Sequence, residues 1–366
     1  MRFDQIIGNR DAVRALEGMA ASGRIPHAMM LYENDGCGAV ALVMAFLSEV
    51  FKDEHKVSGL IHPDVHYVYP VANGSKENEK VENLRAELFL GYWRELIKAN
   101  PYALESEVSS AFGVEGKQTG INNAEAKEIL ETVYLSSVEG GYKAVVVYLP
   151  EKMNTAAANR LLKAIEEPPE KTLFLMITHA PEKVMQTISS RCQAIRVPPC
   201  SKEEIQEVLV SSFGKSSEEA AQAALVAGGS VGVALQYLSG KEEYQEQVGI
   251  FRNLMEALSS RDLTAALACG EEMASLGSRE KQKAFCNFAA DCIRKIFMMQ
   301  QGLEEISGIM PQEKEFYMEI AGKCGRSFCR SSLDIISRAA SRLERNVNQK
   351  MIFCNMASKM FCSVRQ

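Results

Sequence analysis

The 366-residue sequence lacks several features that would place it in a specialised class of proteins. It contains no run of 18 apolar residues, so we expect no membrane-spanning helix. It contains no Cys-x2-Cys pair, and its ten cysteines are widely scattered. Scattered cysteines are commonly small core residues, so we predict neither disulfides nor a zinc site. The loosely spaced His55, His62 and His66 do not change the expectation that the chain binds no metal.

The amino-terminal stretch MRFDQIIGNRDAV also lacks the apolar segment of a signal peptide and carries charges in its place. We therefore expect a cytoplasmic protein. An excess of positive charge is absent as well, because the net charge is −6. This balance argues against nonspecific nucleic-acid binding by the chain as a whole.

Positive charge is nevertheless concentrated near the carboxyl end. From Lys323 onward, nine Lys and Arg residues stand against two acids, Asp334 and Glu344. Such a stretch is typical of a surface that faces DNA or an acidic partner. It is at least as typical of the solvated face of an ordinary helix, and the sequence leaves both interpretations open.

The first 200 residues alternate between predicted helices and short apolar runs. Runs of this length without polar alternation are typical of strands that are buried on both faces of a parallel sheet. The predicted strands are residues 28–32, 65–71, 144–149, 172–178 and 193–197. Between the third and the fourth, Asn154 is a candidate N-cap for an amphipathic helix that ends before Pro168-Pro169. Strand, helix and strand in this order predict βαβ units and a doubly wound α/β domain.

Three domains follow from the pattern along the chain. The α/β domain covers residues 1–199 and contains an insert at about 73–120. In that insert we expect a polar segment at 73–83, a helix from about Leu84 to Lys98, and a loop at 100–120. A small helical domain is predicted at 200–240, where Ser201 with Glu204 and Ser216 with Glu219 have the spacing of capping boxes. Long amphipathic stretches predict a helical bundle over residues 241–366.

A strand, a glycine turn and an apolar helix at residues 28–47 form the outline of a phosphate-binding loop. The usual pattern, G-x-x-x-x-G-K-[ST], includes a lysine for the phosphates and a hydroxyl for Mg²⁺. The turn here contains Gly36 and Gly38. With Gly38 in the last glycine slot, Glu33 takes the first-glycine slot, and Ala39 and Val40 take those of the lysine and the hydroxyl. The scaffold of a nucleotide site is therefore present without its chemistry.

Several segments together resemble the bacterial clamp-loader AAA+ subunits of DNA polymerase III, and among them most nearly the delta-prime type. They are RIPHAMMLY with the loop outline, HPDVHYVYPV, EGGYKAVVVYLPEKMNTAAANRLLKAIEEPPEKTLFLMIT and ISSRCQAIRVPP. The resemblance covers nearly all of the first 240 residues and extends weakly to RNVNQKMIF. It implies an α/β AAA+ domain with a doubly wound parallel sheet, a helical lid domain and an all-α collar domain for oligomerisation. The four zinc-binding cysteines of many relatives are absent between Ser48 and Asp64.

The resemblance also indicates which functional groups are missing. It places Tyr148 and Leu149 in the two acidic slots that would hold Mg²⁺ and position water in an active ATPase. It places Gly232 in the slot of the lid's sensor arginine. The loss of function at three separate places predicts a former nucleotide site that does not hydrolyse ATP. Weak nucleotide binding through backbone N–H groups stays open.

One charged position of the family is kept, in the segment ISSRCQ. The resemblance implies that Arg191 projects across a subunit boundary toward ATP that a neighbouring subunit holds. An arginine supplied in trans stabilises transition-state charge and accelerates phosphoryl transfer by about 10³–10⁵ in well-studied NTPases. Ser190 and Cys192 are expected to support this loop. The alternative is that Arg191 caps a helix or forms a surface salt bridge.

The resemblance implies a non-hydrolysing, delta-prime-like subunit of a clamp-loader ring that places a sliding clamp on primed DNA. Its expected partners are gamma/tau-type motor subunits, which bind ATP and Mg²⁺, and a delta subunit. The clamp and the primer–template DNA are reached through the complex, and no membrane is involved. A first alternative is an ATP-hydrolysing motor subunit with a non-standard P-loop, in which Lys52 or Lys152 replaces the lost lysine. A second is a DNA-binding module in which the basic carboxyl-terminal stretch is the main feature.

Overall fold

The computed structural model describes residues 1–72, 85–303, 307–309, 313–345 and 347–364. Its described residues form two compact units, Met1–Leu235 and Gln236–Gln366. The first unit contains a five-stranded parallel sheet in the order β2-β3-β4-β1-β5. The strands are β1 (Ala28–Tyr32), β2 (Val65–Val68), β3 (Lys143–Tyr148), β4 (Thr172–Thr178) and β5 (Gln193–Arg196).

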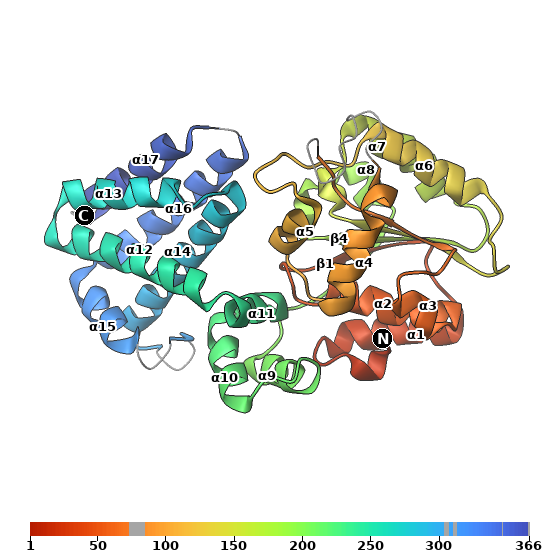
Figure 1. The fold of residues 1–366 in the computed structure, drawn as a ribbon, viewed down its shortest axis with the longest axis horizontal. Coiled ribbons are helices and arrows are strands. Elements are labelled where there is room, and N and C mark those ends of the chain that lie inside the picture. The colour runs from red at the N-terminus through yellow and green to blue at the C-terminus, as the bar shows by residue number, and fades with distance from the viewer. Residues whose placement is uncertain (73–84, 304–306, 310–312, 346, 365–366) are drawn as a thin grey trace. The chain divides into compact units, whose positions relative to one another are not determined.

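Alternate residues of the central strands belong to two separate apolar cores, one on each face of the sheet. Val146 and Tyr148 of β3 pack into one core, and Val145 and Val147 pack into the other. Helices therefore cover both faces of the sheet, with α1 and α2 on one side and α6 and α7 on the other (Figure 1). The predicted α/β fold class with a doubly wound parallel sheet is confirmed. The helices of this part are α1 (Arg10–Ser22), α2 (Ala39–Phe51), α3 (Glu54–Ser58), α4 (Leu90–Ala99), α5 (Glu105–Phe112), α6 (Asn123–Tyr134), α7 (Thr155–Glu166) and α8 (Gln186–Ser189).

The predicted strands agree with the observed ones except at their ends. The second is shorter than predicted, because β2 stops at Val68 and Pro70 has no N–H to continue the ladder. Val71 instead forms an isolated antiparallel bridge with Gly120.

The structure corrects the interpretation of the insert. Residues 100–120 are not all loop, because α5 occupies Glu105–Phe112. Glu107 accepts a hydrogen bond from the Leu104 N–H at 2.8 Å and so satisfies one of the free donors at the start of this helix. Val108 and Phe112 are one helical turn apart, and both are buried in the core. The helix predicted at 84–98 is α4, Leu90–Ala99, preceded by the 3-10 helix η3, Ala86–Phe89. The polar segment predicted at 73–83 lies outside the described residues.

Three predicted helix caps are confirmed. Asn154 accepts a hydrogen bond from the Ala157 N–H at 2.8 Å at the start of α7. Ser201 and Ser216 form capping boxes with Glu204 and Glu219 at the starts of α9 and α10. The helices that follow β5 are α9 (Lys202–Ser211), α10 (Ser217–Val226) and α11 (Val231–Ser239). Because α9 and α10 group with the sheet in one compact unit, the predicted division at residues 199 and 240 stays a prediction.

The described residues of the second unit form helices joined by turns, with no strand among them. Its apolar core includes Phe251, Phe285, Phe328 and Phe353, and most of its cysteines are buried as free thiols. The helices are α12 (Lys241–Ser260), α13 (Leu263–Ala274), α14 (Arg279–Gln300), α15 (Lys314–Lys323), α16 (Arg326–Glu344) and α17 (Gln349–Ser363).

Among the described helices, no single one is both long enough and apolar enough to cross a membrane. Only the pair α10 and α11, bent by 116° at the break between them, reaches the necessary length and composition when taken together.

Candidate functional site

The turn between β1 and α2 has the backbone of a phosphate-binding loop. Gly36 has φ 77° and Gly38 has φ 113°, a left-handed region that glycine adopts without strain. The helix α2 begins at Ala39, directly after Gly38. Free N–H groups at a helix start, together with the helix dipole, normally favour an anion at this place.

The anion position is taken by a side chain of the protein itself. The Glu33 carboxylate accepts a hydrogen bond from the Ala39 N–H, with 2.7 Å between Oε2 and N. Glu33 is buried, and its side chain retains 3% of its exposure. The carboxylate therefore binds an N–H that would otherwise face a phosphate, and its charge opposes the entry of one.

The space around the two glycines is also filled by the protein. A Cβ on Gly36 would lie 2.7 Å from both Leu104 Cδ2 and Ser230 Oγ. A Cβ on Gly38 would lie 3.0 Å from the ring of Tyr102. Because these glycines have no side chain, residues of the insert and of the helical segment after β5 pack directly against the turn. In an active loop, the same space is open to a phosphate.

Gly232, in the slot of the sensor arginine, is part of this packing. Its N–H donates a hydrogen bond to the Gly36 carbonyl oxygen at 3.1 Å. A Cβ at residue 232 would lie 2.3 Å from the Tyr102 carbonyl oxygen, which is closer than real Cβ atoms come. The backbone arrangement thus excludes any side chain at this position, including an arginine.

The two residues in the acidic slots are buried, and neither carries a carboxylate. Tyr148 is 2% exposed at the end of β3, and Leu149 is 2% exposed just after it. The Tyr148 ring packs 5.3 Å from Trp93 of α4 and 5.7 Å from His179, measured between ring centroids. Burial raises the pKa of the Tyr148 hydroxyl well above its usual value, so this oxygen remains protonated and is a poor ligand for a cation.

A charged cluster that the sequence analysis missed lies beside the filled loop. His179 Nε2 lies 3.5 Å from Asp35 Oδ1 and 3.7 Å from Glu33 Oε1, and His179 Nδ1 lies 4.0 Å from Glu105 Oε2. Asp35 in turn accepts a hydrogen bond from the Glu105 N–H at 3.0 Å. His179 directly follows β4, at the same edge of the sheet as the glycine turn. This position is the signal in the sequence that could have identified His179 as a site residue.

The cluster changes the proton affinity of its members. Burial opposes a charge on His179, but the neighbouring Glu33, Asp35 and Glu105 outweigh it and raise its pKa to about 9. At 3.7 Å the contact with Glu33 is an ion pair, because the distance is too long for a hydrogen bond. Burial raises the pKa of Asp35 to about 6, although the charge on His179 opposes the change. The Asp35 side chain is still 35% exposed, so this burial is partial.

The two lysines considered as replacements for the P-loop lysine differ in position. Lys52 is the C-cap of α2, at the opposite end of the helix from Ala39. Lys152 lies nearer, because its Nζ forms an ion pair with Glu105 and donates a hydrogen bond to Thr119 Oγ1 at 3.1 Å. Its charge is therefore committed to a carboxylate of the cluster.

Arg191 lies away from the glycine turn, between α8 and β5. The parallel register pairs Gln193, at the start of β5, with Met29 near the start of β1. Arg191 is therefore at the amino edge of the sheet, whereas the glycine turn is at the carboxyl edge. Its Nη2 forms a 3.1 Å ion pair with Glu166 Oε1 at the end of α7, and its Nη1 donates to the Thr187 carbonyl oxygen at 2.9 Å. In the single chain, the salt bridge considered as an alternative is thus present.

The neighbours of Arg191 have no evident chemical role of their own. Ser190 is exposed and caps α8. Cys192 Sγ lies 3.8 Å from Met176 Sδ, and burial raises the pKa of the Cys192 thiol to about 11. A thiol that stays protonated near neutral pH is a poor nucleophile.

Across the described chain, no group of three or more His, Cys, Asp or Glu side chains is arranged to hold a metal ion. The expectation that the chain binds no metal stays a prediction.

The chain matches a known protein family over more than half of its length. The family model for the DNA polymerase III delta subunit matches residues 8–201. The subunit delta' of DNA polymerase III from Yersinia pestis is 30% identical over 184 residues, which cover 49% of this chain and 44% of that protein. The subunit delta' from Escherichia coli is 33% identical over 143 residues, or 39% of this chain and 42% of that protein. The matched part thus spans less than half the length of these relatives.

Among solved structures, a gamma subunit-related protein of DNA polymerase III from Thermotoga maritima covers 96% of this chain and 99% of its own. Its sequence identity is 16% and its TM-score is 0.41, a likeness too low to establish a shared fold. The family assignment therefore depends on the sequence matches. These place the chain in the DNA polymerase III delta-subunit family, and the curated relatives described above are subunits delta'.

Proposed function

We propose that this protein is the non-hydrolysing, delta-prime-like subunit of a cytoplasmic clamp-loader ring. In that ring it contacts gamma/tau-type motor subunits and a delta subunit, and the complex places a sliding clamp on primed DNA. The observation that carries the non-hydrolysing part is the bond from the Ala39 N–H to Glu33. It supports a loop that is closed to phosphate by the protein's own carboxylate, with no lysine or Mg²⁺ ligand to overcome the repulsion.

The packing around the loop supports the same conclusion. A nucleotide would have to displace Tyr102 and Leu104 from the two glycines as well as Glu33 from the helix start. Lys152, the nearest candidate for a substitute lysine, is paired with Glu105. In this proposal the chain itself binds neither ATP nor Mg²⁺, and the partner subunits bind both.

Arg191 is proposed to act on ATP bound by a neighbouring subunit. Its place at the amino edge of the sheet keeps it from the glycine turn of its own chain, which lies at the carboxyl edge. Its side chain is 34% exposed and its partner Glu166 is 55% exposed, so the ion pair is worth about 1 kcal/mol or less. The phosphate oxygens of a neighbour's ATP would bind the guanidinium more strongly, because it fits them bidentately.

The test is the DNA- and clamp-stimulated ATPase rate of the reconstituted ring with Arg191→Ala. We expect the ring to assemble and the turnover of the neighbouring site to fall by roughly a hundredfold or more. Arg196→Ala is the matched control, because Arg196 is an exposed arginine on the adjacent strand β5. Normal turnover in an assembled Arg191→Ala ring would overturn the trans role.

The isolated chain is assayed beside the ring. It should neither bind nor hydrolyse ATP. Hydrolysis by the isolated chain that is lost in Lys152→Ala would instead support the alternative of a motor subunit with a non-standard P-loop.

A further inference from the structure

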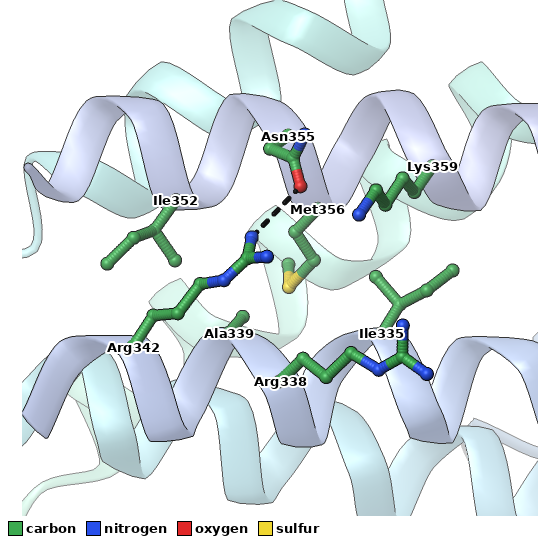
Figure 2. A pocket seen from close by; sticks show the side chains of 8 residues that line it. All are labelled: Ile335, Arg338, Ala339, Arg342, Ile352, Asn355, Met356 and Lys359. Carbon is green, nitrogen blue, oxygen red and sulfur yellow. Dashed lines mark hydrogen bonds between the residues drawn. The ribbon is translucent and has the colours of Figure 1, made fainter. Parts of the chain in front are cut away.

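The basic carboxyl-terminal stretch forms a groove within the second unit. Figure 2 shows the groove between α16 and α17, which run side by side. Its floor is apolar, and its rim carries polar and charged side chains. The floor consists of Ile335, Ala339, Ile352 and Met356, and the rim of Arg338, Arg342, Asn355 and Lys359.

Three cations converge on this groove. Arg338 and Arg342 are one turn apart on α16, about 6 Å along the helix axis. Lys359 reaches the groove from α17 on the opposite side (Figure 2). Arg342 Nη1 donates a hydrogen bond to Asn355 Oδ1 at 3.3 Å, which holds this guanidinium over the groove. All three side chains are exposed.

Within the part of the chain that the structure describes, these three cations form no ion pair, although an acid lies one turn before Arg338 at Asp334. Other cations of the same unit are paired. Lys350 lies 2.8 Å from Glu271, and Lys323 and Arg294 have partners on their own helices. The groove is therefore a local concentration of uncompensated positive charge on a chain whose net charge is −6.

We propose that this groove binds the phosphodiester backbone of nucleic acid independently of its sequence. Two guanidiniums one turn apart can bind neighbouring phosphates of one strand, and Arg matches phosphate oxygens bidentately. The lining contains no aromatic side chain on which a base could stack, so contacts to the backbone are favoured over contacts to the bases.

An acidic protein segment is the competing occupant, and the shape of the groove disfavours it. A protein partner normally anchors a large apolar or aromatic side chain in a well-formed pocket. The cavity volume of the groove is about 20 Å³, far below the roughly 300–1,000 Å³ of ordinary ligand pockets. The groove is positively charged and shallow, which suits contacts to phosphates better than the burial of a large side chain. The inference goes beyond the proposed function, in which DNA is reached only through the complex.

The test measures binding of a fluorescent single strand of about 20 nucleotides to the full chain by anisotropy, at about 50 mM and about 200 mM salt. The groove variant is Arg338→Gln with Arg342→Gln and Lys359→Gln. The matched control is Arg24→Gln with Arg261→Gln and Arg330→Gln, which removes the same charge from exposed positions outside the groove. Circular dichroism and thermal melting check that both variants are folded.

We expect the groove variant to bind roughly tenfold or more weakly than the parent at the lower salt concentration. The slope of log affinity against log salt should fall by about 2, because three phosphate contacts are lost. The control variant should keep most of the affinity and most of the salt dependence of the parent. Equal losses in the two variants would overturn the proposal in favour of a general charge effect. Polyglutamate that displaces the strand at equal charge concentration would overturn it in favour of an acidic protein partner.

Discussion

The Glu33 carboxylate lies on the Ala39 N–H at 2.7 Å, in the place where a phosphate-binding loop binds its ligand. This contact links the loss of catalytic residues to a structural gain. The N–H groups at the start of α2 need an acceptor in either case, and here the chain supplies one itself. The degenerate loop thus has a structural role: it packs β1 and α2 against the insert and the segment after β5.

Replacing Glu33 tests the structural role of its contact with the Ala39 N–H. Glu33→Ala leaves a buried N–H without its acceptor, and we expect the free energy of unfolding to fall by about 1–3 kcal/mol. Glu33→Gln keeps an acceptor oxygen and should lose less. Urea unfolding measures both. Neither variant should gain a thermal shift with ATP, because Tyr102 and Leu104 still fill the turn. An ATP-dependent shift in Glu33→Ala would show that the carboxylate alone excludes nucleotide.

Gly232 tests the close backbone approach. In Gly232→Ala the new methyl group would lie 2.3 Å from the Tyr102 carbonyl oxygen, so the backbone must move. We expect destabilisation by about 1–3 kcal/mol or more. Gly18→Ala is the control, because nothing lies within 4 Å of its added Cβ in the exposed face of α1. That change should stabilise the protein by about 0.5–1 kcal/mol in the same thermal or urea experiment. Equal stabilities of the two variants would contradict the packing described here.

The raised pKa of His179 predicts a pH dependence of stability. A histidine whose pKa rises from 6.5 to about 9 on folding contributes stability that is fully present below pH 6.5. This contribution, on the order of 3 kcal/mol, is lost as the pH rises through about 9. His179→Gln should therefore flatten the stability curve between these values.

His66→Gln is the control for this titration. Burial lowers the pKa of His66, so its effect appears as the pH falls and not between pH 6.5 and 9. Denaturant unfolding over the pH range measures both variants. A curve for His179→Gln that stays as steep as that of the parent would show that the cluster does not hold the imidazolium.

The Arg191–Glu166 pair predicts a small effect on the stability of the single chain. Arg191→Ala and Glu166→Gln should each change the free energy of unfolding by about 1 kcal/mol or less, because both side chains are partly exposed. Thermal melting of the isolated chain measures this. A large loss in either variant would mean that the pair is structural, and a loss of ring activity in Arg191→Ala would then have a different cause.

Local features of the fold could be predicted where the signal lies within a few residues. The strands at 28–32 and 172–178, the Asn154 cap and the two capping boxes depend on neighbours in sequence, and all are confirmed. The helix α5 was missed, because its eight residues contain few apolar positions and follow a segment rich in turn residues. The early stop of β2 at Val68 depends on Pro70, whose effect is visible in the sequence.

By itself, the sequence determined that the phosphate loop has neither the lysine nor the hydroxyl of the usual pattern, since these are identities at fixed spacing. Only the tertiary structure decided what takes the place of the ligand. His179 reaches the glycine turn because β4 and β1 run parallel and bring their carboxyl ends to one edge of the sheet. Tyr102 comes from the insert and Gly232 from α11, and both pack against the glycines of the turn. The same order places Arg191 at the opposite edge. Contacts of this kind depend on the order and register of the strands, which no local pattern encodes.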